Sequence, residues 1–224
     1  MGRAILKKNH EKVLKIQTAV SYAFEENSYI ISLENGKECV IVDPGIEPEQ
    51  LLEMLCTQKL TPAAILVTHG HYDHIGGISN VRKKWPECKI WASAVEAKKL
   101  ADPNLNLSAM FGLPQFAPPA DKILEDGEKF TVAGLDFQAI LVPGHAGGHL
   151  VFALDEADHS NVFVGDTIFA GSVGRGDFPD GDSRLLIHSI QSKLLTFPDN
   201  TVLFPGHGSK TTVGREKRSN PFFQ

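Results

Sequence analysis

One stretch of ten residues decides how the rest of this chain is interpreted: Thr68-His69-Gly70-His71-Tyr72-Asp73-His74-Ile75-Gly76-Gly77. It places four potential metal ligands within six residues, after the apolar run of residues 63–67 and before a glycine-rich turn. Imidazole and carboxylate groups bind zinc, iron and manganese in proteins. In an extended segment the side chains of His69 and His71 point the same way, so both can reach one ion. Asp73 and His74 lie just beyond and can reach a second ion.

Three further apolar runs also end at a potential metal ligand. Residues 138–142 lead into His145, residues 161–164 into Asp166, and residues 201–204 into His207. Runs of this length, bounded by glycine and proline, are typical of buried strands. Such strand ends can gather along one edge of a sheet sandwich. The combined set is His69, His71, Asp73, His74, His145, Asp166 and His207, which is too many ligands for one tetrahedral ion and suits two ions that share a carboxylate.

The order and spacing of these motifs resemble the metallo-β-lactamase superfamily. The shared signature is Thr-His-x-His-x-Asp-His, then Pro-Gly-His, Gly-Asp-Thr and a second Gly-His, and it extends over roughly residues 20–210. Within that superfamily the chain looks most like short, single-domain glyoxalase II (hydroxyacylglutathione hydrolase) proteins, through residues 169–175 and 214–221. The resemblance implies one domain over residues 1–224, with a core of about residues 15–210 and no C-terminal glutathione-binding helical domain.

The remaining pattern predicts alternating helices and strands. Residues 27–33 and 38–42 flank an Asn-Gly pair, which is a strong hairpin signal. Ser93 and Glu96 have the spacing of a capping box at the start of a helix. Helices are expected over residues 47–59, 75–84, 93–100 and 183–195. This pattern alone indicates an α/β or α+β protein; the resemblance implies the α+β class, as a four-layer αββα sandwich with the metal site at one edge of the β-sandwich.

Composition excludes several classes of protein. The 224 residues are 42% hydrophobic and carry a net charge of −5, which fits one sizeable domain without a basic surface for nucleic acid. No apolar stretch approaches the ~20 residues of a membrane span, and no signal peptide is evident at the N-terminus. Cys39, Cys56 and Cys88 form no Cys-x-x-Cys motif, which indicates reduced, buried thiols in a cytoplasmic protein. The composition carries no signal for a particular oligomeric state.

The resemblance assigns a role to each ligand. His69, His71 and His145 would bind the first metal ion. Asp73, His74 and His207 would bind the second, and Asp166 would bridge the two. The cofactor is expected to be two divalent ions, with zinc first and iron or manganese as alternatives, because the same ligands serve all three. Asp73 is also the expected catalytic residue, since it can orient a hydroxide and move its proton.

The implied reaction is hydrolysis of S-D-lactoylglutathione or a related acyl thioester by a hydroxide that bridges the two metal ions. The expected partner is therefore a small-molecule thioester, glutathione-linked in the first case. A thiolate is a good leaving group, so no strong general acid is required. Arg175 matches a loop lysine of longer glyoxalase II relatives and is expected to bind a substrate carboxylate. Lys210 and Arg215 are further candidates for substrate binding.

Two other activities stay open at this point. A persulfide dioxygenase of the same superfamily would use a single iron bound by His69, His145 and Asp166. The ligands of the second site argue against a need for only one metal. A metal-dependent nuclease is the other alternative, and the acidic charge of the chain disfavours it.

Several segments have two interpretations. Asp43 follows an apolar run and either starts a turn or accepts a hydrogen bond from a ligand histidine. His149 is either an eighth ligand or, since the ligand positions are filled, a hydrogen-bonding residue at a strand start. Residues 102–119, which carry prolines and large apolar side chains, form either a lid or substrate wall, or a loop packed on the surface. The remaining histidines are expected to be ordinary surface or helix residues: His10, His159 and His188.

Overall fold

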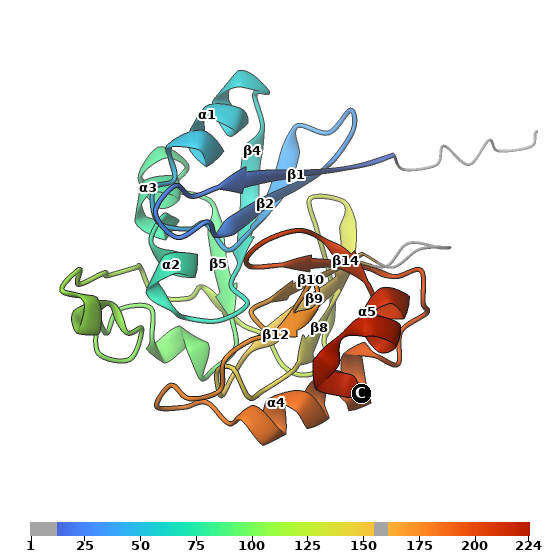
Figure 1. The fold of residues 1–224 in the computed structure, drawn as a ribbon. Coiled ribbons are helices and arrows are strands. Elements are labelled where there is room, and N and C mark those ends of the chain that lie inside the picture. Colours follow the sequence, from blue (N-terminus) through green and yellow to red (C-terminus); the bar gives the residue numbers. More distant parts are fainter. Residues whose placement is uncertain (1–12, 155–160) are drawn as a thin grey trace, which may run out of the picture.

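The computed structural model describes residues 13–154 and 161–224, and its ribbon is shown in Figure 1. The first of two six-stranded sheets has the strand order β1-β2-β3-β4-β5-β6. Its strands are β1 (Leu14–Val20), β2 (Asn27–Leu33), β3 (Glu38–Val42), β4 (Thr61–Leu66), β5 (Lys89–Ala92) and β6 (Lys122–Ile123). The first three strands pair antiparallel, and β3 to β6 pair in parallel. Parallel neighbours require crossover connections, which place helices against this sheet.

The second sheet has the order β14-β13-β10-β9-β8-β7. Its strands are β7 (Lys129–Val132), β8 (Leu135–Leu141), β9 (Leu150–Leu154), β10 (Asn161–Gly165), β13 (Val202–Pro205) and β14 (Thr211–Thr212). All neighbours pair antiparallel except β10 and β13, which are parallel. A separate hairpin joins β11 (Ile168–Phe169) to β12 (Ser172–Val173).

Short helices connect these strands. They are α1 (Glu49–Thr57), α2 (Tyr72–Ile75), α3 (Ile78–Lys84), α4 (Ser183–Ser189), its π-helical continuation η3 (Ile190–Leu194), α5 (Val213–Ser219), and the 3-10 turns η1 (Glu96–Lys98), η2 (Ser108–Phe111) and η4 (Pro221–Phe223). The Asp182 carboxylate caps α4 by accepting hydrogen bonds from the first backbone N–H groups of that helix. No helix among the described residues is both long enough and apolar enough to span a membrane.

Three apolar clusters define four layers. Adjacent residues of β2 point to opposite faces, so Ile30 joins one cluster and Ile31 another. Ile30 packs in a cluster with Leu55 of α1, whereas Ile31 packs between the two sheets in a cluster with Phe163 of β10. The third cluster joins the outer face of the second sheet to α4 through Leu186. Figure 1 shows α1 and α3 outside the first sheet and α4 and α5 outside the second. The α+β class and the αββα sandwich are thus confirmed.

Three local expectations require correction. The helix expected over residues 75–84 is two helices, α2 and α3, which separate at Gly76 and Gly77. A Cβ atom on Gly77 would lie 2.6 Å from the Gly45 carbonyl oxygen, so the chain passes too closely here for a side chain. The helix expected over residues 93–100 is only the 3-10 turn η1. Cys56 is exposed rather than buried, because it lies on the solvent side of α1, whereas Cys39 and Cys88 are buried.

Candidate metal centre

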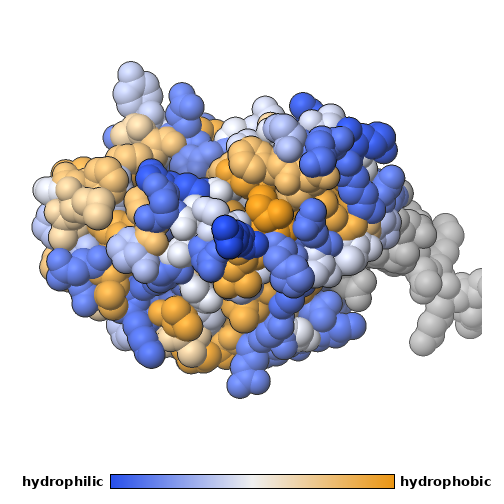
Figure 2. All heavy atoms as spheres, turned by 60° about the horizontal axis from the view of Figure 1, so that its bottom comes forward, coloured by the Kyte–Doolittle hydropathy of each residue, from blue (hydrophilic) through white to orange (hydrophobic). Residues whose placement is uncertain are grey.

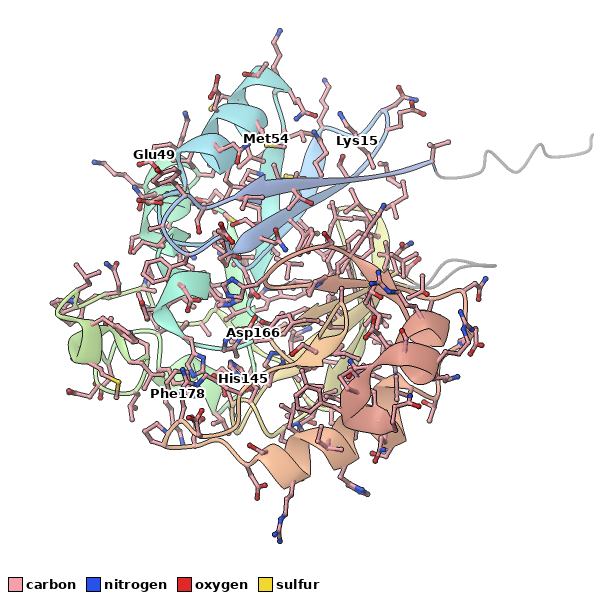
Figure 3. The ribbon with its side chains drawn as sticks, in the orientation of Figure 1. Lys15, Glu49, Met54, His145, Asp166 and Phe178 are labelled. Carbon is pink, nitrogen blue, oxygen red and sulfur yellow. The ribbon has the colours of Figure 1, made fainter. Side chains whose placement is uncertain are left out.

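The metal-ligand candidates lie beyond the ends of four strands at one edge of the sandwich. β4 leads to His69 and His71 and then to α2, which carries Asp73 and His74. β8 leads to His145, β10 to Asp166 and β13 to His207. Figure 3 shows His145 and Asp166 close together with Phe178, on the side away from Lys15 and Met54. The strands of both sheets therefore bring together residues that are far apart in the sequence.

The first group of ligands consists of three imidazoles. The Nε2 atom of His145 lies 3.2 Å from Nε2 of His69 and 3.0 Å from Nδ1 of His71. Two nitrogens bound to the same tetrahedral zinc ion at ordinary bond lengths are about 3.3 Å apart. Burial, followed by the neighbouring His145 and Lys99, lowers the pKa of His71 to about 3, and burial also lowers the pKa of His69. Burial lowers the pKa of His145 as well, so the three rings are neutral at pH 7, which is the form that binds metal.

The second group contains Asp73, His74 and His207. The Oδ2 atom of Asp73 lies 3.3 Å from Nε2 of His207 and 3.7 Å from Nε2 of His74. Burial disfavours the charged form of His74, but the carboxylates of Asp166 and Asp73 outweigh it and raise the pKa of His74. This group thus includes a carboxylate ligand candidate, whereas the first group consists of imidazoles alone.

Asp166 faces both groups. Its Oδ2 atom lies 3.7 Å from Nε2 of His145 and 3.6 Å from Nε2 of His207, and its Oδ1 atom lies 3.4 Å from Nε2 of His74. Burial raises the pKa of this carboxyl, but His74 and its other histidine neighbours hold it far below its usual range. The Asp166 carboxylate thus places an oxygen beside each of the two groups, which is the arrangement that a ligand shared by two metal ions requires.

The hydrogen bonds of the histidines test whether this site fits metal ions. Nδ1 of His145 donates to the Arg175 carbonyl (2.8 Å), and Nδ1 of His207 donates to the Phe24 carbonyl (3.0 Å). Each ring therefore turns its Nε2 lone pair inward, toward the other ligands. Nε2 of His74 and Oδ1 of Asp166 are buried without a hydrogen-bond partner. Buried polar atoms of this kind require a partner, and a bound cation supplies it.

Asp43 lies behind the site and orients two of the candidate ligands. Its carboxylate accepts hydrogen bonds from Thr68 N (2.8 Å) and Thr68 Oγ1 (2.6 Å), and it lies 3.1 Å from Nδ1 of His74. Because the Thr68 hydroxyl donates to Asp43, its oxygen accepts from Nδ1 of His69, 3.0 Å away. Asp43, His69 and His74 have potential ligand atoms within 4.8 Å of one another, but these contacts already occupy the Asp43 oxygens. Asp43 thus acts as the hydrogen-bond acceptor rather than a simple turn residue.

His149 is placed beside the ligands but not among them. Its ring stacks on His69, with centroids 4.8 Å apart and an interplanar angle of 17°. Its Nε2 atom accepts a hydrogen bond from the backbone N–H of Asp166 at 3.2 Å. Burial, followed by the neighbouring His145, lowers its pKa, so the ring is neutral and able to accept. His149 is therefore a support for Asp166 and His69. Of the other histidines, His188 is exposed on α4, while His10 and His159 lie outside the described residues.

Sequence reasoning missed a buried ionic network beside the first group. The Glu96 carboxylate accepts hydrogen bonds from Gly70 N (2.7 Å) and Gly148 N (2.8 Å), and it pairs with Lys99 at 2.9 Å. Lys99 also contacts Asp180, whose carboxylate accepts from Gly147 N. The capping box assigned to Glu96 is only half formed: Ser93 Oγ accepts from Glu96 N, while the carboxylate turns to the metal loops. Lys99, three residues after Glu96, was the one feature of the sequence that could have indicated this ion pair.

A cavity of about 480 Å³ opens over the ligands and includes Arg175 in its wall. The guanidinium of Arg175 donates to both carboxylate oxygens of Asp177, at 2.6 and 2.8 Å, and lies 4.1 Å from the centre of the Phe178 ring. Lys210 and Arg215, the other candidates for substrate binding, are exposed and are not among the described residues that line this cavity. The segment of residues 102–119 contributes to its wall through Leu107 and Phe111.

An αββα sandwich with paired His/Asp donor groups at one sheet edge has the architecture of a metal-dependent hydrolase. The chain belongs to the metallo-beta-lactamase superfamily, whose sequence model matches residues 22–207. The resemblance seen in the motifs is thereby confirmed.

Individual relatives agree with this assignment over most of their length. Hydroxyacylglutathione hydrolase GloC from Haemophilus influenzae is 38% identical over 202 residues, which cover 89% of this chain and 93% of that protein. The crystal structure of the BLEG-1 B3 metallo-beta-lactamase matches with a TM-score of 0.88 and 35% identity, covering 94% of this chain and 100% of that one. TTHA1623, crystallised in a di-iron-bound form, matches with a TM-score of 0.79 and 36% identity, covering 92% of this chain and 99% of that one.

Proposed function

We propose that this metal-dependent hydrolase cleaves acyl thioesters, with S-D-lactoylglutathione or a related acyl thioester as substrate. The observation that carries the proposal is the position of Asp166, whose two carboxylate oxygens face both donor groups within 3.4–3.7 Å. The similarity to the hydroxyacylglutathione hydrolase GloC supports the choice of a thioester. The proposed cofactor is two divalent ions, with zinc first; the di-iron form of TTHA1623 supports iron as an alternative.

We assign a separate role in the reaction to each group of residues. His69, His71 and His145 would hold one ion, Asp73, His74 and His207 the other, and Asp166 would contact both. When bound, such ions act as Lewis acids and lower the pKa of a coordinated water toward neutrality. Asp43, with Thr68, keeps His69 and His74 in the tautomer whose Nε2 atom faces inward.

Asp73 is the proposed catalytic carboxylate. Burial raises its pKa, but His74 and His207 lower it below the usual value, so the group is ionised at neutral pH. Its Oδ2 atom faces the two histidines. We assign the orientation of the attacking water, and acceptance of its proton, to Oδ1. The departing thiolate is stable as an anion, so the reaction does not require a strong acid in the cavity wall.

The proposal is tested by measuring metal content per chain and S-D-lactoylglutathione turnover on one preparation. We expect about two ions per chain and turnover that is abolished in His71→Ala and Asp166→Ala. His188→Ala is the matched control, because this histidine is exposed on α4, outside the ligand groups. Two bound ions without turnover of any acyl thioester would reject the thioesterase.

The alternatives give different results in the same preparation. One iron per chain, with oxygen consumed in the presence of glutathione persulfide, would establish the dioxygenase. Cleavage of RNA or DNA would establish the nuclease. The single-domain organisation over residues 1–224, the cytoplasmic location and the lack of a nucleic-acid partner stay predictions from the sequence.

A further inference from the structure

We propose that the cavity over the metal centre binds an apolar acyl group, so that the preferred substrates are thioesters of aromatic or branched apolar acids rather than of small hydroxy acids. This inference rests on the proposed thioesterase function and, among the acyl thioesters proposed there, favours apolar acyl groups over the lactoyl group of S-D-lactoylglutathione. The acyl group would lie against a wall of aromatic side chains that begins at the metal ligands and continues to the rim of the cavity.

The composition of the wall is the first observation. Five of the described residues that line the cavity are metal-ligand candidates, and three of the remainder have polar groups: Ser172, Arg175 and, through its hydroxyl, Tyr72. The Tyr72 ring and the other six side chains present apolar surface: Phe24, Leu107, Phe111, Phe169, Val173 and Phe178. A hydroxyl or carboxylate on the acyl group would find few partners here, whereas an aromatic ring would be covered on several sides.

The aromatic surface starts at the ligand rings themselves. Phe178 packs edge-on against His71, with centroids 5.2 Å apart, and Phe169 contacts His207 in the same manner at 6.2 Å. Further out, the Phe111 ring lies 5.2 Å from the ring of Tyr72. A substituent on a carbonyl bound at the metal centre therefore meets apolar surface within the first few atoms.

The outer part of this wall is preformed. Asn106 is fully buried, and its side-chain amide donates to the carbonyls of Lys99 and Gln115 while its oxygen accepts from Ser108. These bonds hold Leu107 in the left-handed region at φ 70°, an uncommon conformation for a residue with a branched side chain. The carbonyl of Asn106 also accepts from Tyr72 N, next to the ligand His71. The loop is thus fixed to the metal centre as a rigid surface.

Charge disfavours a substrate with two carboxylates. Arg175 is the single arginine or lysine among the described lining residues, and Asp177 already accepts from two of its five N–H groups and balances its charge. A glutathione conjugate carries two carboxylates, so at least one would lack a cationic partner in the cavity wall. A thioester whose thiol portion carries no charged group, or only one, fits these residues better.

The rim extends the apolar surface outward. Phe111 is 51% exposed, and Met110, Leu113 and Phe116 of the same segment are exposed as well. In Figure 2 hydrophobic residues gather at the left edge, the side on which Figure 1 places this segment. Binding of an acyl group would cover the part of the Phe111 ring that faces the cavity. Phe116 does not line the cavity, which makes it a matched control.

The test measures hydrolysis of three thioesters by the metal-loaded protein. The three carry an acetyl, a lactoyl or a phenylacetyl group on N-acetylcysteamine, a thiol without charged groups. We expect kcat/KM for the phenylacetyl thioester to exceed that for the lactoyl thioester by at least about tenfold, as burial of a ring against apolar surface predicts. Phe111→Ala should lower the preference for phenylacetyl over acetyl about tenfold, and Phe116→Ala should leave it within twofold. Equal or lower kcat/KM for phenylacetyl in the wild type would overturn the inference without further variants.

Binding of the product acids separates this inference from the proposed function. Calorimetric titration of the metal-loaded protein with phenylacetate, lactate and acetate reports the preference of the cavity without turnover. Tighter binding of phenylacetate, lost in Phe111→Ala, supports the apolar site even if no thioester is hydrolysed and the thioesterase fails. Turnover of lactoyl thioesters with no preference for phenylacetate in either assay would retain the thioesterase and reject the apolar acyl site.

Discussion

Replacement of Glu96 by glutamine tests the idea that a buried carboxylate holds the two loops of the first donor group together. Glu96 is fully buried, accepts N–H groups from Gly70 and Gly148, and pairs with Lys99, which is 5% exposed. The amide of glutamine keeps one acceptor oxygen, but it places an NH₂ group where the second acceptor was. The variant therefore loses one hydrogen bond to a charged group and the charge that balances Lys99.

The size of the effect follows from these contacts. Breaking a buried ion pair by removing one partner costs about 3–5 kcal/mol, because the other charge stays buried. Asp180 also contacts Lys99 and retains part of its stabilisation, so we expect about 3 kcal/mol in the free energy of unfolding. Gly70 lies between His69 and His71, so the first metal site should also weaken, by about 10–100-fold, as is usual when a residue supporting the ligands is removed.

Urea unfolding of the metal-free protein measures the first quantity, and competition with a chromophoric chelator measures the second. Glu128→Gln is the matched control, because Glu128 pairs with Lys122 at 2.7 Å with both side chains partly exposed. An exposed pair of this kind contributes at most about 1 kcal/mol. If Glu96→Gln matched this control in stability and bound metal like the wild type, the proposed role of the network would be refuted.

Three further predictions concern other parts of the chain. Asp43→Ala should weaken binding of metal by about tenfold or more in a chelator competition, because two ligand histidines lose the acceptor that orients them; unchanged affinity would contradict this. In the native protein a thiol reagent at pH 8 should modify Cys56 alone, since burial raises the pKa of Cys39 and of Cys88 to about 12; fast labelling of two or three thiols would disagree. Removal of metal by a chelator should lower the thermal midpoint, because an ion at 1,000 times its Kd stabilises the folded state by about 4 kcal/mol, and an unchanged midpoint would argue against a bound ion.

The grouping of the candidate ligands was predictable from the sequence because their signal is local. Each follows an apolar run within a few residues, and the end of that strand fixes its approximate position without knowledge of distant residues. The four-layer sandwich required the resemblance, since the strand pattern alone fits more than one architecture. Arg175 was placed in the cavity wall, whereas Lys210 and Arg215 were not, because a basic residue in a tail carries no signal for the direction of its side chain.

The parts that the sequence did not predict depend on contacts between distant segments. Glu96 had a satisfactory local explanation as a capping residue, and the loops around Gly70 and Gly148 that compete for its carboxylate are 26 and 52 residues away. Phe24 and Phe178 carry no local signal for a site, because only the folded chain brings them beside Tyr72 and His71. The local sequence shows which nearby group a side chain can hydrogen-bond. Only the tertiary structure shows whether a group from a distant segment binds that side chain instead.

The buried residues that hold the candidate ligands in place make contacts around His69. On its N-terminal side Asp43 binds Thr68, whose hydroxyl accepts from the His69 ring, and on its C-terminal side Glu96 binds the N–H of Gly70. His149 stacks on the same ring and also accepts from the backbone of Asp166, the proposed shared ligand. Because Asp43 contacts His74 directly as well, one carboxylate orients a ligand in each donor group. The two groups are thus coupled through their supports, so a change behind one metal position also reaches the other.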